Sequence, residues 1–194
     1  MPHPSSIPLI LASASPRRRD LLAQIGLHPV VAAAEIDETP LVRELPQAHV
    51  QRLAHAKAHH IAAMHPGAVV IAADTGGACG RRLLPKAEEE KQAQACLALL
   101  SGRRHRVYGG ICVIAPDGRV ARRVVMTAVV FRRLDGSDVE RYLAGGEWRG
   151  KAGGYAIQGS AAAFVRSLNG SYTNVVGLDL YAASALLRGA GIAV

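Results

Sequence analysis

A short apolar segment that leads directly into a basic helix start constrains the fold of this chain more than any other feature. Residues 7–12 form an apolar run typical of a buried strand. Immediately afterwards, Ser15 suits a helix N-cap, Pro16 the first helical position and Gly26 the C-terminal stop. The pattern predicts a strand followed at once by a helix, the repeating unit of an α/β sheet.

Three arginines occupy the first turn of this predicted helix, where the helix dipole already presents positive charge. Cations at this end lower the stability of a helix, so Arg17, Arg18 and Arg19 are unexpected there. A bound anion, held by free backbone N–H groups and paired with arginine, resolves the conflict. A solvated basic helix is the alternative. At about 100° per residue, Arg18 shares the apolar stripe, Arg17 flanks it and Arg19 points away. We therefore expect Arg17 and Arg18 to face a phosphate site.

The remaining pattern alternates between strands and helices, with one hairpin. We expect strands at 29–34, 68–73 and 164–168, and helices at 46–64, 88–100, 135–143 and 179–187. Two extended segments, 106–114 and 119–131, flank a Pro-Asp-Gly turn and predict a long antiparallel hairpin. The chain is therefore predicted to fold as α/β, with a mixed twisted sheet flanked by helices on both faces.

Acidic residues follow two of the predicted strands. Asp74 comes directly after the 68–73 strand, at the kind of strand end where an α/β sheet forms its ligand crevice, although Asp before two glycines is also common in turns. Glu35, Asp37 and Glu38 lie on a loop after the second strand. The alternative interpretation of this loop is a solvated acidic turn. Carboxylates that converge on a triphosphate bind Mg²⁺ or Mn²⁺ and position a water molecule.

Two lysines suit the same anionic ligand. The 46–64 helix has an apolar stripe that includes Ile61 and Met64, and Lys57 interrupts it. Such a lysine either extends from the helix edge to water or reaches into a cleft. Lys86 is a flexible point charge that suits a phosphate, or is a surface lysine ahead of a helix.

A glycine-rich segment, 153–159, adds a third candidate feature. Closely spaced glycines permit a ligand to approach the backbone, and Gln158 within the segment offers both a donor and an acceptor. A structural turn is the alternative. The segment is therefore a candidate ligand-binding loop.

Composition excludes several classes of protein. The 194 residues, 49% of them hydrophobic, suffice for one globular domain with a substantial core. Aromatic residues make up 4%, which argues against stacking platforms for single-stranded nucleic acid. The net charge of +8 favours an anionic partner without distinguishing a nucleotide from nucleic acid.

Cysteine usage and hydropathy bear on the compartment. The three cysteines are odd in number and lack metal-type spacing, which suits a reducing cytoplasm. No apolar run approaches the roughly 18 residues that span a bilayer, and the first dozen residues lack the pattern of a secretory signal. We therefore expect a cytoplasmic protein with no membrane partner.

Taken together, the motifs resemble the Maf family. The resemblance rests on LASASPRR at 11–18, IDET at 36–39, ADT at 73–75, PK at 85–86, GEWRGKAGGYAIQG at 146–159 and NGSYTNVVGL at 169–178. The match is collinear over nearly the whole chain, and the first and the glycine-rich motifs are the specific ones. It implies a single Maf-like domain over residues 1–194, with an inosine triphosphatase-like architecture and a central cleft.

The resemblance implies a nucleoside triphosphate pyrophosphatase, with a house-cleaning role in nucleotide metabolism. Such enzymes cleave between the α and β phosphates and release a nucleoside monophosphate and pyrophosphate. Asp74 aligns with the family's proton acceptor for the attacking water, and Glu38 with a loop carboxylate that assists with a divalent metal, Mg or Mn. Both are therefore expected as catalytic residues and metal ligands. The positions that align with the phosphate and substrate pocket are Ser13, Arg17, Arg18, Lys57 and Lys86.

Three positions resemble the branch of the family that acts on dTTP and UTP, and possible substrates include modified pyrimidine nucleotides. They are Arg17 after the Ser-Pro pair, Thr75 after the catalytic Asp, and Gln158 in the Ile-Gln-Gly motif. A glutamine satisfies the imide edge of a pyrimidine with one donor and one acceptor. One alternative is the same reaction on 7-methyl-GTP or another non-canonical nucleotide. An alternative of another class is a non-catalytic, basic nucleic-acid-binding or septum-formation regulatory protein, although no nucleic-acid-binding motif is present. The resemblance also implies a homodimer.

The chain departs from the family pattern at three places. Gly76-Gly77 stands where branched apolar residues are usual, which predicts a looser strand end and a slower reaction. Asp179 replaces a usual proline, and Gly109-Gly110 is unusual within a strand. None of these changes removes a catalytic group.

Overall fold

The computed structural model describes residues 7–194, which form a seven-stranded sheet with helices packed against it. Residues 1–6, part of the segment in which we expect no secretory signal, lie outside the described residues. In chain order the elements are β1 (Leu9–Leu11), α1 (Pro16–Gln24), β2 (Val30–Val31), α2 (Pro46–Met64), β3 (Val69–Cys79), β4 (Arg82–Leu83), β5 (Lys86–Ala87), α3 (Glu90–Leu100), β6 (Arg104–Ile114), β7 (Val120–Phe131), α4 (Gly136–Gly145), β8 (Lys151–Ala152), the 3₁₀ turn η1 (Ser160–Phe164), β9 (Val165–Asn169), α5 (Tyr172–Val176) and α6 (Leu180–Gly189).

The mixed α/β sheet expected from the sequence is confirmed. The strand order is β2-β1-β3-β6-β7-β9, with β4 paired to β3. β1 is parallel to both β2 and β3, whereas β6, β7 and β9 continue the sheet in antiparallel fashion. A separate two-stranded ribbon joins β5 to β8. No helix among residues 7–194 is long and apolar enough to cross a membrane.

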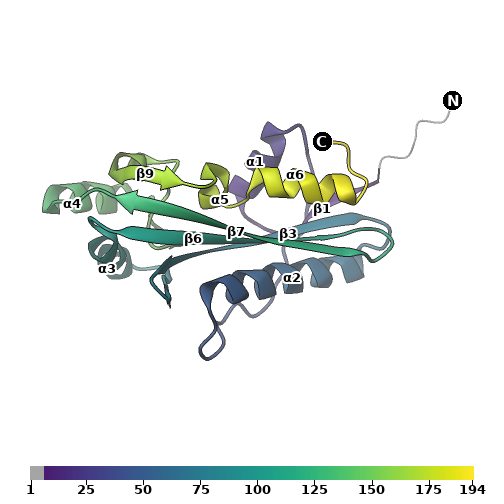
Figure 1. Cartoon of the computed structure of the whole chain (residues 1–194), viewed down its shortest axis with the longest axis horizontal. Helices are drawn as coiled ribbons and strands as arrows, with labels where there is room; N and C mark the ends of the chain where they lie inside the picture. Colours follow the sequence, from purple (N-terminus) through teal and green to yellow (C-terminus); the bar gives the residue numbers. More distant parts are fainter. Residues whose placement is uncertain (1–6) are drawn as a thin grey trace.

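Helices cover both faces of the sheet (Figure 1). α2 lies along one face, and α1, α5 and α6 lie on the other, while α3 and α4 pack together near one end. Side chains of successive residues in a strand point to opposite faces, so β3 contributes to two cores. Val69 and Ile71 belong to the core under α1 and α6, and Val70 and Ala72 to the core under α2. The same alternation holds further along β3, where Asp74 and Thr75 point to opposite faces of the sheet.

Three expectations about element bounds are wrong. The strand predicted at 68–73 does not end before Asp74 but runs to Cys79, because residues 74–78 pair with β6. The segment around Lys86, predicted as loop, contains the short strands β4 and β5, and the strand predicted at 29–34 is reduced to Val30–Val31. The helix α5 gave no signal that separated it from the surrounding turns.

The helix α2 matches its predicted range, but its apolar stripe is shorter than expected. Ile61 and Lys57 are buried, whereas Met64 is 54% exposed at the last turn. Ile61 packs in the core between α2 and the sheet, whereas Met64, one turn later, is not part of that core. The prediction that Met64 belongs to the buried stripe is therefore wrong.

The unusual glycines of the sheet permit close packing. A Cβ on Gly110 would lie 2.3 Å from the Val50 carbonyl oxygen of α2, and one on Gly109 would lie 2.0 Å from Oδ1 of the buried Asn174. Glycine at these positions lets α2 and α5 approach β6 closely. Gly76-Gly77 does not loosen a strand end, because both residues lie inside β3 and pair with β6.

Asp179 has a local role in place of the usual proline. It is the N-cap of α6, and its Oδ1 accepts a hydrogen bond from the Ala182 backbone N–H at 2.6 Å. Such a cap satisfies one of the free N–H groups at a helix start. Asp179 therefore starts α6 by capping its first turn, where the family pattern usually has a proline.

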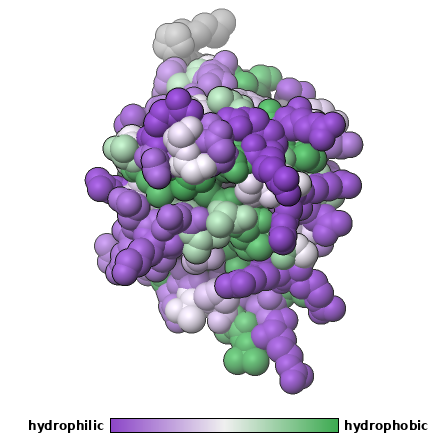
Figure 2. Space-filling model, turned by 90° about the vertical axis from the view of Figure 1, so that its left-hand side faces the viewer, coloured by the Kyte–Doolittle hydropathy of each residue, from purple (hydrophilic) through white to green (hydrophobic). Residues whose placement is uncertain are grey.

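The end of the molecule that carries α3 and α4 is mostly hydrophilic (Figure 2). Figure 2 shows the end of the molecule that carries α3 and α4, where hydrophilic side chains cover most of the face and a smaller hydrophobic area lies near its middle. The site described below lies in a cavity.

Candidate functional site

A gap in the sheet positions the candidate site. On one edge, β3 pairs with β1 only through Val69–Ile71 and with β4 only at Ala78–Cys79. Among the described residues, the stretch of β3 between these two pairings has no strand on that edge. The chain leaves β1 at this point to enter α1, so a cavity of about 690 Å³ opens where the sheet divides. This volume suits a small-molecule site.

The cavity brings together all nine side chains predicted from the sequence. They come from segments far apart in the chain: the turn before α1, α1 itself, the acidic loop, α2, β3, β5 and the glycine-rich segment. The predicted residues that line the cavity are Ser13, Arg17, Arg18, Glu38, Lys57, Asp74, Thr75, Lys86 and Gln158. Gln158 is exposed at the rim, whereas Ser13, Lys57 and Asp74 are buried.

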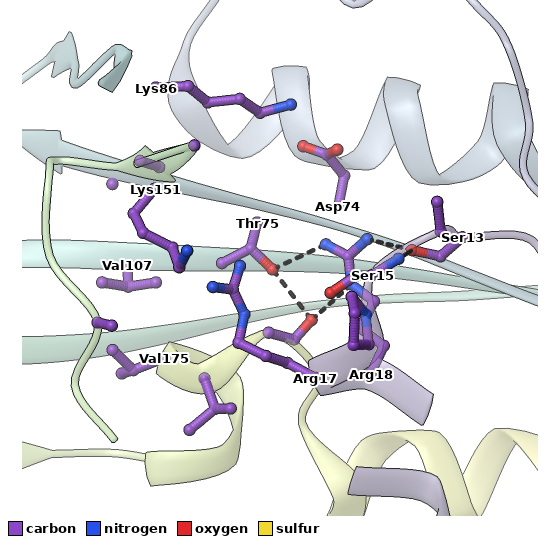
Figure 3. Close-up of a pocket in the computed structure, with 18 of the residues that line it drawn as sticks. Ser13, Ser15, Arg17, Arg18, Asp74, Thr75, Lys86, Val107, Lys151 and Val175 are labelled. Atoms are coloured by element: carbon purple, nitrogen blue, oxygen red, sulfur yellow. Dashed lines mark hydrogen bonds between the residues drawn. The ribbon is translucent and has the colours of Figure 1, made fainter. Parts of the chain in front are cut away.

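Alternation along β3 separates the cavity into two walls. Asp74 has the parity of Val70 and Ala72, so its side chain points toward α2. Thr75 has the opposite parity and points toward α1 and α5. Figure 3 shows this division, with Asp74 on one side of the strand and Thr75 on the other. We call the side of Asp74 the carboxylate wall. We call the side of Thr75, where Arg17 and Arg18 lie, the arginine wall.

On the carboxylate wall, a buried lysine joins two acids. Nζ of Lys57 lies 2.7 Å from Oδ1 of Asp74 and 2.5 Å from Oε1 of Glu38. The second oxygen of Glu38 lies 2.5 Å from Nζ of Lys86. Lys57 is buried because the helical period puts it on the same stripe as Leu53 and Ile61, which fill the core under the sheet. The lysine thus reaches into the cleft, as one of the two sequence interpretations proposed.

The two lysines hold Glu38 as a carboxylate. Partial burial alone would raise its pKa, but hydrogen bonds and charge from Lys57 and Lys86 lower the pKa to about 2. The opposing effects follow from desolvation, which disfavours charge, and neighbouring cations, which favour it. Glu38 therefore carries its negative charge throughout the physiological pH range.

A second ionic network fixes the loop that carries Glu38. Glu44 accepts hydrogen bonds from Nε and Nη2 of Arg52 at 2.6 and 2.8 Å, and lies 2.9 Å from Nδ1 of His49. Arg52 also donates to the Thr39 carbonyl oxygen at 3.1 Å. Hydrogen bonding by Arg52 lowers the pKa of Glu44 to about 2 despite burial. The start of α2 therefore anchors the acidic loop over the site.

On the arginine wall, Arg18 is bonded to the protein. Its Nη1 donates to Ser13 Oγ at 2.9 Å, its Nε to the Gly177 carbonyl at 2.9 Å, and its Nη2 to Thr75 Oγ1 at 3.3 Å. Thr75 donates in turn to the same Gly177 carbonyl at 3.1 Å. Burial lowers the pKa of Arg18, and the negative charge of Asp74 opposes that shift. These bonds join α1, β3 and α5 around one side of the cavity.

Arg17 differs from its neighbour. Its Nε is buried and has no hydrogen-bond partner among the described residues, and burial lowers the pKa of its guanidinium. A buried polar group without a partner is unfavourable, and a cation more so. Arg19, by contrast, is exposed and lies 3.5 Å from Asp20. The division of the three arginines expected from the helical period is therefore observed.

Sequence reasoning gave no role to several other groups that line the cavity. Lys151 lies in β8, just before the glycine-rich segment, Tyr155 lies within that segment, and Val107 and Val175 supply apolar surface. The signal for Lys151 was present, because it is a cation beside the Gly153-Gly154 pair. The carbonyl of Gly177, which accepts a hydrogen bond from Arg18, gave no signal, since every residue has a backbone carbonyl and the sequence does not distinguish this one.

The carboxylates of Asp74 and Glu38 are the side chains of the cavity that suit a divalent metal ion. Residues 7–194 contain no group of three or more His, Cys, Asp or Glu side chains able to hold a metal by themselves. Mg²⁺, however, is commonly held by one or two carboxylates together with substrate phosphates and water. Asp74 and Glu38, which share Lys57, fit such a partial site when an anionic ligand supplies further oxygens.

The fold and the site define an α/β protein whose cavity places cations opposite a lysine-bridged pair of carboxylates. The Maf-like protein family model matches residues 8–190. The chain belongs to the Maf family.

Curated relatives align over nearly the whole chain. It is 62% identical over 186 residues to a dTTP/UTP pyrophosphatase of Paramagnetospirillum magneticum, with 95% of this chain and 98% of that protein covered. It is 59% identical over 188 residues to a dTTP/UTP pyrophosphatase of Rhodospirillum rubrum, with 96% and 90% covered.

Among solved structures, similarity is distant. A nucleoside-triphosphatase (dITP/XTP pyrophosphatase) of Mycobacterium abscessus matches with a TM-score of 0.41 and 17% identity, covering 66% of this chain and 74% of that one. The Ham1 protein of Staphylococcus aureus matches with a TM-score of 0.44 and 15% identity, covering 63% and 71%.

Proposed function

We propose that this chain is a dTTP/UTP pyrophosphatase that hydrolyses the α–β phosphoanhydride of its substrate to a nucleoside monophosphate and pyrophosphate. The observation that carries the proposal is the buried Lys57, which holds Asp74 and Glu38 together opposite the arginine wall. High identity to relatives named for this activity supports the choice of reaction. One seven-stranded main sheet, with a core on each of its faces, supports a single domain.

In the proposed mechanism, Asp74 is the general base. One of its oxygens is held by Lys57, and the carboxylate borders the cavity, where it orients a water molecule and accepts its proton. The water oxygen forms a bond to the α phosphorus, and the bond from that phosphorus to the bridging oxygen breaks. The electron pair leaves with the pyrophosphate, so negative charge grows on the departing group. Cations of the arginine wall stabilise that charge.

Arg18 and Ser13 have a different role in this proposal from Arg17. The guanidinium of Arg18 is bonded to Ser13, Thr75 and the Gly177 carbonyl, so it shapes the cavity and adds charge at short range. Arg17 has its Nε free of partners among the described residues and is the arginine available to bind phosphate directly.

A divalent ion completes the proposal. When bound by Asp74 and Glu38 together with substrate phosphates, Mg²⁺ or Mn²⁺ neutralises phosphate charge as a Lewis acid. Lys86 and Lys57 neutralise Glu38 in the structure described here.

Gln158 is proposed to recognise the base. It is exposed and lines the same cavity, whose lining also includes Val107 and Val175. An amide side chain pairs with the imide edge of thymine or uracil through one donor and one acceptor. We also propose a cytoplasmic homodimer; its three free cysteines suit a reducing compartment, and light scattering of the purified protein tests the dimer.

A nucleotide panel tests the proposed function. Pyrophosphate release is measured with Mg²⁺ and with Mn²⁺ from dTTP, UTP, 7-methyl-GTP, dITP and the common triphosphates. We expect dTTP and UTP to have the highest kcat/KM. Preference for 7-methyl-GTP would overturn the substrate assignment, and salt-sensitive binding to duplex DNA without turnover of any nucleotide would overturn the enzyme assignment.

A matched pair of variants tests the role of Asp74. Asp74→Asn keeps the size of the side chain and is expected to lower kcat by at least about 100-fold, the usual contribution of a general base. Asp20→Asn changes the exposed acid beside Arg19 and is expected to leave kcat unchanged. Full activity of Asp74→Asn would exclude this carboxylate as the base.

A further inference from the structure

We propose that Lys151 is a further substrate-binding residue and that, with Arg17, it forms the subsite for the terminal phosphates of the substrate and for the pyrophosphate product. This inference rests on the proposed function, because it assigns one part of the same cavity to one part of that substrate. The supporting observation is how the cations of the cavity are paired.

Most cations that line the cavity already have partners. Lys57 and Lys86 form ion pairs with Asp74 and Glu38 on the carboxylate wall. Arg18 donates to three oxygens of the protein. The guanidinium of Arg149 lies 5.1 Å from the ring centroid of Trp148. The charges of Lys57 and Lys86 are therefore neutralised by protein acids, and the donors of Arg18 are occupied by neutral oxygens, whereas Arg149 lies over an aromatic ring.

Arg17 and Lys151 lack such compensation. Neither has a carboxylate within ion-pair distance in residues 7–194. The Nε of Arg17 is buried without a partner, and Nζ of Lys151 donates only to the Arg149 carbonyl oxygen, at 2.8 Å. The carboxylate of Glu147 attracts Lys151 at longer range. Both cations thus border the cavity without a bonded anion and with N–H donors left for a ligand.

The two charges act on each other. Burial lowers the pKa of Lys151, and the positive charge of Arg17 lowers it further. Burial also lowers the pKa of Arg17. Like charges held close in a half-buried cavity repel one another, and an anion placed between them removes the repulsion. A pyrophosphate group has several negative oxygens and can bond to both side chains.

Strand register explains why Lys151 faces this wall. β8 pairs with β5 so that Lys86 lies opposite Ala152 and Ala87 opposite Lys151. Lys86 and Lys151 therefore point to opposite faces of the ribbon. Lys86 reaches Glu38 on the carboxylate wall, and Lys151 lies on the side of Thr75 and Arg17, as Figure 3 shows.

The two walls then have distinct tasks. Asp74 on the carboxylate wall faces the phosphorus that water attacks, while Arg17 and Lys151 on the arginine wall bind the pyrophosphate that departs. Charge that develops on the leaving oxygen meets cations that are not already neutralised by protein acids. Inorganic pyrophosphate is therefore expected to bind this subsite by itself and to inhibit as a product.

The test measures pyrophosphate and dTMP separately. We expect Lys151→Gln to raise the Kd of inorganic pyrophosphate, measured by calorimetry, about tenfold or more, the loss typical of one charge-assisted hydrogen bond. The inhibition constant of dTMP, which lacks the terminal phosphates, is expected to stay within about twofold. Lys151→Arg keeps the charge and is expected to restore most of the pyrophosphate affinity.

Controls separate this inference from a structural role and from the proposed function. Lys91→Gln removes one positive charge from the exposed face of α3 and is expected to leave both affinities unchanged. Equal losses for pyrophosphate and dTMP, or unchanged pyrophosphate affinity in Lys151→Gln, would overturn the inference. If the wild-type protein binds pyrophosphate through Lys151 but hydrolyses no nucleotide, the subsite stands and the proposed function does not.

Discussion

Replacement of Lys57 tests the carboxylate wall most directly. Lys57→Met keeps much of the apolar stem on the stripe of α2 but removes the charge that lies 2.7 Å from Asp74 and 2.5 Å from Glu38. The side chains of Lys57 and Asp74 are only 8% and 9% exposed, so the carboxylate of Asp74 would be left buried without its cation. The free energy of unfolding should therefore fall.

The size of the loss follows from this burial. Removing one partner of a buried ion pair costs about 3–5 kcal/mol, and the lower end applies because the pair borders a cavity open to water. We expect a loss of about 3 kcal/mol for Lys57→Met. For a chain of this length, that corresponds to a fall in Tm of about 6–12 °C.

A second variant isolates the interaction. Asp74→Asn leaves Lys57 paired with Glu38, so its cost should be smaller, about 1 kcal/mol. In the double variant, neither charge of the pair is left alone. The two single losses should therefore exceed the double loss by about 1.5 kcal/mol or more, which is the coupling energy of a double-mutant cycle.

Urea unfolding provides the assay. Trp148 is the single tryptophan of the chain and is 3% exposed, so its fluorescence should report the loss of the native state. Lys91→Met, on the exposed face of α3, is the matched control and is expected to have no effect beyond about 0.5 kcal/mol. Losses that add within about 0.5 kcal/mol in the double variant would refute the reasoning, since independent sites behave in that way.

Four further predictions follow from particular contacts. Gly110→Ala places a Cβ 2.3 Å from the Val50 carbonyl oxygen and should cost about 3 kcal/mol in a denaturation assay, whereas Gly136→Ala meets no atom within 4 Å and should be nearly neutral. Burial lowers the pKa of His105 to about 4, so the unfolded chain binds its proton first as pH falls below about 6.5. The free energy of unfolding should therefore decline by up to about 1.4 kcal/mol per pH unit as pH falls from 6.5 to 4. In thermal melts at pH 7 and pH 5, His105→Phe should show a smaller decline. An unchanged decline would show that His105 titrates normally. Chelation by EDTA should abolish pyrophosphate release and added Mg²⁺ restore it; persistent release in EDTA would exclude the metal. Arg19→Gln should leave KM for dTTP unchanged, because Arg19 is exposed outside the cavity, and a raised KM would contradict that placement.

Local signals predicted much of the fold. The N-cap position and proline of α1, the full range of α2 and the long β6–β7 hairpin all agree with the structure, because each depends on a short stretch of sequence. The same holds for the face of a helix on which a charged residue lies, since the helical period alone separates Arg18 from Arg19 on α1 and places Lys57 on the apolar stripe of α2; that Lys57 is buried was left open. Strand ends were less predictable: β3 continues past Asp74 only because β6 pairs with it.

The sequence by itself determined which residue types were available and, within each element, which face they occupy. Only the tertiary structure decided what they meet there. Lys57 contacts Asp74, 17 positions away in the chain, and Arg18 contacts the Gly177 carbonyl, 159 positions away. Such pairings depend on sheet register and on the crossing of distant segments, which no local period encodes. For this reason the sequence pointed to the arginines of α1 as candidate phosphate ligands, while the gap beside β3, the two walls and the position of Lys151 on the cavity emerged only in the folded chain.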